Sequence, residues 1–66
     1  MGEKWASNVS RNIIIRAETT KDGRVWLDVF DHAGKKEIQF ESVDEFETFR
    51  NAVSKLHIEV KKYHKE

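Results

Sequence analysis

The sequence predicts an α+β domain in which a three-stranded antiparallel β-meander precedes one long C-terminal helix packed on one sheet face (β-β-β-α). Two observations predict this class. Residues 12–41 hold three segments of alternating apolar and polar residues, separated by turns at residues 21–23 and 32–35. Residues 42–63 then carry large apolar residues at helical spacing. The short connections favour antiparallel pairing of consecutive strands.

The three strands are expected at residues 12–19, 24–31 and 36–41, where β-branched and aromatic residues alternate with polar ones. One face of the resulting sheet is apolar throughout. Its members are Ile13, Ile15, Ala17, Val25, Leu27, Val29, Ile38 and Phe40. This face is the expected core of the domain.

The register of both hairpins follows from keeping those residues on one face, because a slip of one residue would move every side chain to the other face. A three-residue first loop, with Gly23 in the left-handed conformation, pairs Leu27 with Ala17. A four-residue second loop pairs Leu27 with Phe40. Both hairpins then agree on the apolar face.

The helix opens on a capping box, in which Ser42 accepts from the amide of Glu45 and Glu45 reaches back to the amide of Ser42. One apolar stripe follows: Phe46, Phe49, Val53, Leu56, Val60 and Tyr63. Packed on the apolar sheet face, it makes a two-layer sandwich. A helix of about 22 residues spans about 33 Å and outreaches a strand of about 26 Å. We therefore expect Val60 and Tyr63 to overhang the sheet and contact a second copy.

Size and composition place the chain among small domains without disulfides. It has 66 residues, no cysteine, and twelve basic against twelve acidic residues. We expect a flexible N-terminal arm at residues 1–10 and a single domain at residues 11–66. No apolar segment has the length of a membrane span or the character of a signal peptide, so we expect a cytoplasmic protein without membrane contact.

The second face of the predicted sheet has no helix to cover it. It carries an apolar patch of Ile14, Trp26 and Phe30, with Arg16 and Arg24 beside it. Uncovered patches of this kind mark interaction sites. Three covers fit: the N-terminal arm, a protein partner or second copy, and single-stranded nucleic acid, whose bases stack on exposed aromatic rings.

Each cover has its own residues. The arm would lay Trp5 on Trp26. Nucleic acid would need cations for its backbone, and Lys35 and Lys36 add to the arginines here. Four acids on or near the same face oppose it: Glu18, Asp28, Glu37 and Glu41. The even charge balance also counts against non-specific nucleic-acid binding.

The order of motifs resembles two related groups. Arg24-Val25-Trp26-Leu27-Asp28-Val29, a turn, Lys36-Glu37-Ile38-Gln39-Phe40, and Glu45-Phe46-Glu47-Thr48-Phe49 opening the helix look like the purine-rich-element-binding repeat and the single-stranded-DNA-binding transcriptional coactivator family. The resemblance covers residues 12–60 as a pattern of residue types. It implies a curved antiparallel sheet backed by a helix, a dimer, and binding of single-stranded nucleic acid on the sheet. Members of both groups usually show four strands and are more basic.

No catalytic or metal signature is present. The three histidines are His32, His57 and His64, and the helical pair is seven residues apart, whereas two ligands on a helix need a spacing of three or four. Asp44 and Glu45 are explained by the helix dipole. We therefore expect no enzymatic activity, no metal and no cofactor.

The sequence thus predicts a small non-enzymatic homodimer that binds single-stranded nucleic acid on the open sheet face. The alternative is a protein–protein interaction module, such as a small regulator or inhibitor of a larger protein. The residues expected to bind nucleic acid or a partner are Trp26, Phe30, Ile14, Arg16, Arg24, Lys35, Lys36 and Trp5. The expected dimer contacts are Val60 and Tyr63.

Overall fold

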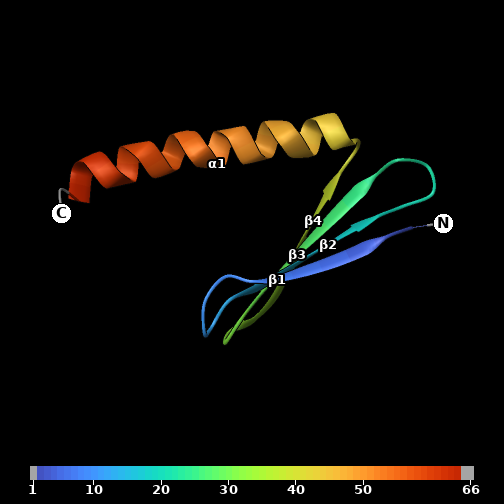
Figure 1. Ribbon diagram of the computed structural model, residues 1–66, viewed down its shortest axis with the longest axis horizontal. Helices are drawn as coiled ribbons and strands as arrows, with labels where there is room; N and C mark the ends of the chain where they lie inside the picture. Colours follow the sequence, from blue (N-terminus) through green and yellow to red (C-terminus); the bar gives the residue numbers. More distant parts are fainter. Residues whose placement is uncertain (1, 65–66) are drawn as a thin grey trace.

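The computed structural model describes residues 2–64. Its elements are β1 (Lys4–Asn8), β2 (Ile14–Thr19), β3 (Val25–Asp31), β4 (Gly34–Phe40) and α1 (Val43–His64). The strands form one antiparallel sheet in the order β1-β2-β3-β4, and α1 follows at its end (Figure 1). The α+β class, the antiparallel sheet and the long C-terminal helix are confirmed. The expected count of three strands is wrong, because residues 4–8 add a fourth.

Strand β1 lies within the segment that was expected to form an arm. It pairs with β2, and Trp5 lies opposite Ala17. The main-chain N–H of Thr19 extends the pairing by donating to the carbonyl of Glu3 at 2.9 Å. All five β1 residues are exposed. Main-chain hydrogen bonds to β2, more than burial of its own side chains, therefore hold β1 in the sheet.

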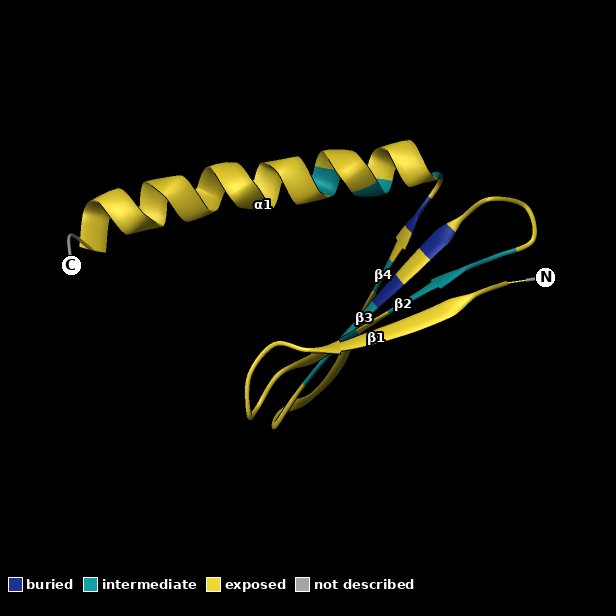
Figure 2. Ribbon diagram, viewed as in Figure 1, coloured by how far each residue is buried: buried dark blue, intermediate teal, exposed yellow. Residues whose placement is uncertain are grey.

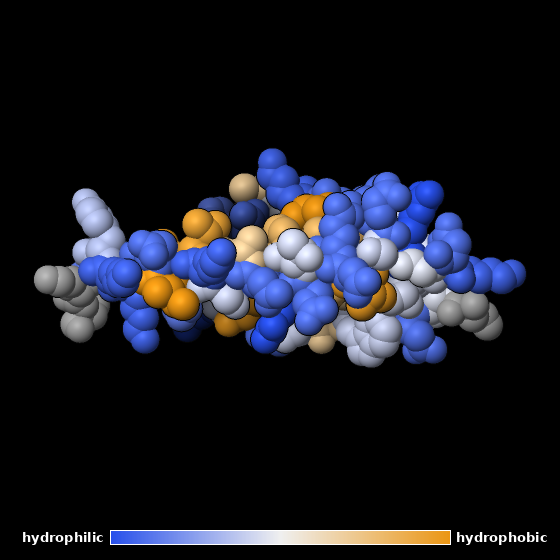
Figure 3. Space-filling model, turned by 90° about the horizontal axis from the view of Figure 1, so that it is seen from above, coloured by the Kyte–Doolittle hydropathy of each residue, from blue (hydrophilic) through white to orange (hydrophobic). Residues whose placement is uncertain are grey.

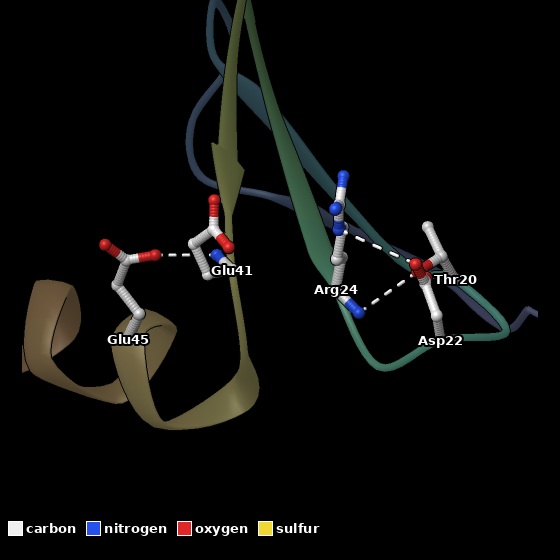
Figure 4. A network of polar contacts seen from close by, with 5 residues as sticks. All are labelled: Thr20, Asp22, Arg24, Glu41 and Glu45. Atoms are coloured by element: carbon white, nitrogen blue, oxygen red, sulfur yellow. Dashed lines mark hydrogen bonds and ion pairs between the residues drawn. The ribbon is translucent and has the colours of Figure 1, made fainter.

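The first hairpin, β2 to β3, has the predicted register and the predicted three-residue loop. Gly23 takes a φ of 91°, in the region that favours glycine. The N–H of Arg24 donates to the Thr20 hydroxyl at 3.0 Å, and this hydroxyl donates in turn to the Asp22 carboxylate (Figure 4). The bond from Thr20 is the largest cause that lowers the pKa of Asp22 below its ordinary value.

The second hairpin, β3 to β4, pairs two residues away from the predicted register. A two-residue turn at residues 32–33 joins the strands, so Leu27 lies opposite Ile38 where Phe40 was expected. Gly34 takes a φ of 136° and already pairs as the first residue of β4, which closes the turn early. Because the shift is even, every side chain stays on its predicted face.

The start of α1 is capped as predicted on one side. The N–H of Glu45 donates to the Ser42 hydroxyl at 3.2 Å. The Glu45 carboxylate reaches one residue further back than expected and accepts from the N–H of Glu41 at 2.6 Å (Figure 4). Since Glu41 directly follows β4, this bond ties the helix start to the end of the sheet.

The core lies where the first turns of α1 meet the end of the sheet. Its buried residues are Val25, Leu27 and Phe40. Phe46 and Phe49 of α1 pack on Phe40, each with ring centroids 5.2 Å from it and tilted ring planes. Such tilted aromatic pairs are favourable beyond their buried area.

The expected layer of helix over the sheet forms only at this end. Every described residue of α1 after Phe49 is exposed, and the helix runs away from the strands (Figures 1 and 2). The described chain is therefore elongated, with extents of 45 × 27 × 16 Å. No helix within residues 2–64 is long and apolar enough to cross a membrane.

Candidate binding surface

The sheet face opposite α1 is uncovered, and we call it the open face. Alternation along the paired strands defines its twelve residues. They are Lys4, Ala6 and Asn8 of β1, Ile14, Arg16 and Glu18 of β2, Trp26, Asp28 and Phe30 of β3, and Lys35, Glu37 and Gln39 of β4. The face is thus a grid of three rows across four strands.

The apolar residues of the open face lie at its two ends. Trp26 is 36% exposed, in a row with Lys4 and Glu18. Ile14 is 43% exposed and lies opposite Phe30. Four residues of extended chain place Trp26 about 13 Å from Phe30. The patch expected from the sequence is therefore two apolar sites with a polar row between them.

An ion pair occupies that middle row. The Arg16 guanidinium lies 3.3 Å from Oδ2 of Asp28, and its carbon lies 5.1 Å from the centroid of the Phe30 ring. Arg16 is thus held between a carboxylate and an aromatic face, a cation–π arrangement. The Asp28 side chain is only 14% exposed, and its Oδ1 has no hydrogen-bond partner among the described residues. The Arg16 side chain remains 48% exposed.

Further cations stand at the ends of the grid. Arg24 leads into β3 beside the first turn, and its Nε lies 3.6 Å from Oδ2 of Asp22, an exposed ion pair. Lys35 lies opposite Phe30 on β4. Lys4 lies next to Glu18 on β1; the sequence reasoning missed it, and recognising β1 as a strand was the signal that would have found it.

An open depression borders the Phe30 end of the grid. It is lined by Arg11, Asn12, Ile14, Phe30, Asp31 and His32. Arg11 and His32 come from the β1–β2 loop and the β3–β4 turn, so two connections far apart in sequence bring basic side chains beside an aromatic ring. His32 was not among the predicted binding residues.

Two of the predicted binding residues lie on the other face. Trp5 lies opposite Ala17, and Lys36 lies opposite Val29, both in rows of the helix-side face. The expectation that Trp5 covers Trp26 is wrong, because β1 pairs with β2 in a register that points the two rings to opposite sides of the sheet. Five of the other six lie on the open face: Trp26, Phe30, Ile14, Arg16 and Lys35. The sixth, Arg24, directly precedes β3.

The charges of the open face balance. Its basic residues are Lys4, Arg16 and Lys35, and its acidic residues are Glu18, Asp28 and Glu37. Asp28 is already neutralised by Arg16. Within residues 2–64, no group of three or more histidine or acidic side chains is placed to hold a metal ion.

The predicted dimer contacts lie on the far half of α1. Val60 and Tyr63 are both largely exposed, and they lie in the part of α1 that runs away from the strands (Figure 1). No family model, curated protein or solved structure matches this chain.

Proposed function

We propose that the open face binds single-stranded nucleic acid. The observation that carries the proposal is the uncovered sheet face on which the exposed Trp26 ring and the half-buried Phe30 ring flank the half-exposed Arg16 guanidinium. Bases stack on aromatic rings irrespective of sequence, and each stacked base contributes about 1–3 kcal/mol. A single-stranded nucleic acid lying along β3 would reach both rings, with its phosphates near Arg16, Lys4 and Lys35.

A second candidate is a protein-interaction module on the same face. The balanced charges of the open face favour it, since strand-binding surfaces carry a basic excess. Aromatic and arginine side chains are also typical anchors of protein interfaces. The two candidates differ in their response to salt: phosphate contacts weaken steeply with ionic strength, whereas a mixed aromatic interface responds weakly.

The two tryptophans provide a matched test, because they lie on opposite faces of one sheet. Trp5→Phe leaves Trp26 as the single tryptophan, and Trp26→Phe leaves Trp5. We expect a mixed-sequence single-stranded oligonucleotide to quench Trp26 and not Trp5, less strongly as salt is raised. Trp26→Ala should weaken binding by about 5- to 150-fold, the loss of one stacked base.

Two fluorescence results would contradict the proposal. Absence of quenching of Trp26 at low salt would exclude strand binding on the open face and leave the protein-interaction candidate. Quenching of Trp5 alone would place the strand on the helix side. The circular dichroism spectra of both Trp→Phe variants should match that of the parent, since each keeps an aromatic ring and neither tryptophan is buried.

A further inference from the structure

A second surface lies on the other side of the sheet. The helix-side surface has two apolar parts. One is the stripe of α1 beyond the core: Val53, Leu56, Val60 and Tyr63, all exposed. The other is a depression in the sheet lined by Trp5, Ala6, Ser7, Ile15, Ala17, Leu27 and Phe46. Figure 3 looks onto the other side of α1, turned away from the sheet, where exposed apolar side chains also lie among charged ones.

The area left open is too large for a compact monomer. The chain exposes 5991 Å², whereas a compact protein of its 7.8 kDa mass exposes about 4,400 Å². Its radius of gyration is 13.8 Å, against about 10.8 Å for a compact domain of this length. The excess of about 1,600 Å² per chain gives about 3,200 Å² for two chains, which is in the range of permanent homodimers.

Charge makes a second copy the fitting occupant. The first turn of α1 carries Asp44 and Glu45, and the last turn carries Lys61 and Lys62. Two antiparallel copies of α1 would bring the acidic start of each beside the basic end of the other. A two-fold axis repeats every such contact, so one pairing satisfies both chains.

We infer that a second copy of this chain covers the helix-side surface. The two α1 helices pack antiparallel along Val53, Leu56 and Val60, and the far half of each helix lies over the sheet depression of the other copy. Both open faces then point outward from the dimer. The inference goes beyond the proposed strand binding and does not depend on it, since the two use opposite faces of the sheet.

The test compares two exposed apolar residues of the same helix. Leu56 lies on the stripe and is 64% exposed; Ile58 is 55% exposed and lies about 200° round the helix from it. By sedimentation at micromolar concentration, we expect the parent chain to have twice the chain mass. Leu56→Glu should give the single-chain mass, and Ile58→Glu should keep the double mass.

Two results would overturn the inference. A single-chain mass for the parent chain would mean that α1 stays extended or folds onto its own sheet. A dimer that responds alike to both substitutions would place the interface elsewhere.

A milder pair keeps the test valid if Leu56→Glu fails to fold, as judged by circular dichroism. On dilution, Leu56→Ala should raise the dissociation constant of the dimer by at least about 30-fold, the lower end of the effect of truncating a buried leucine. Ile58→Ala should leave it unchanged. Equal effects of the two alanine variants would again contradict the inferred interface.

Discussion

Arg16 lies in the middle row of the open face and contacts both Asp28 and Phe30. It neutralises the Asp28 carboxylate at 3.3 Å and lies against the Phe30 ring, yet half of its side chain stays exposed. Asp28 is much less accessible, and one of its oxygens has no partner among the described residues. A largely buried carboxylate depends on its cation more than an exposed cation depends on the carboxylate. The two members of the pair should therefore respond unequally to substitution.

We predict that Arg16→Ala lowers the free energy of unfolding by about 1–2 kcal/mol, because it leaves Asp28 without its cation. Asp28→Asn should change it by no more than about 0.5 kcal/mol, since the amide keeps an oxygen for Arg16. Urea denaturation of both variants measures the difference. A larger loss for Asp28→Asn than for Arg16→Ala would contradict this view of the pair.

Asp28→Asn should also change the affinity of the open face for single-stranded nucleic acid. Removing one negative charge about 6 Å from a phosphate in water is worth about 0.7 kcal/mol. Asp28→Asn should thus strengthen binding of a single strand about threefold at low salt, as measured by fluorescence titration. Glu47→Gln makes the same charge change on α1, away from the open face, and serves as the control. An equal gain for both would indicate only a general effect of net charge.

The positions of the site residues could be predicted where strand alternation was clear. Trp26 and Phe30 fall on the open face because Val25 and Leu27 must face the core. Lys36 shares its parity with Ile38 and Phe40, so alternation already placed it on the helix side. The face of Trp5 could not be predicted, because it depends on the pairing of β1 with β2, and residues 4–8 show no alternation of their own.

At the scale of elements, two short turns set the register of the sheet. The first loop follows its glycine, and its register could be predicted. The second turn could not, because a shift of two residues leaves both faces unchanged and hydrophobic pattern cannot distinguish the two pairings. The deciding contacts are local: the N–H of Ala33 donates to Oδ1 of Asp31 at 2.8 Å, and Gly34 takes a positive φ.

We predict that Gly34→Ala destabilises the protein through backbone strain. Gly34 has a φ of 136°, which side chains rarely adopt, although space is open around it. The expected loss is about 1–3 kcal/mol, or a fall of several degrees in the melting temperature. Ala33→Gly changes the same turn by the same single methyl group and should have the smaller effect. A melting temperature of Gly34→Ala equal to that of the parent would show that the turn relaxes to another conformation.

Strand β1 was not predicted, because here too the hydrophobic pattern gave no signal. Its side chains are all exposed, so nothing in its composition records burial. The available signal lay beside it: Asn8, Ser10 and Asn12 are residue types typical of a hairpin loop leading into β2. The helix was the opposite case, since its cap and its stripe predicted its bounds closely. The apolar stripe alone did not show which surface the helix packs against.

At the scale of the whole molecule, the described core is small. Only Val25, Leu27 and Phe40 are buried, with Phe46 and Phe49 partly covered against them. Small domains without disulfides or metals commonly gain the missing burial by association. The inferred dimer would cover the α1 stripe and the sheet depression together, so folding and association should be coupled.

We predict that the melting temperature rises with protein concentration. If folded chains are dimers, dilution favours unfolding by mass action. A tenfold rise in concentration should raise the melting temperature by roughly 5 °C, given about 1.4 kcal/mol per tenfold and the unfolding entropy of two 66-residue chains. Calorimetry over two decades of concentration measures this, and Ile58→Glu should follow the parent. A constant melting temperature would mean that the three-residue core suffices alone, and that the exposed stripe of α1 does not contribute to stability.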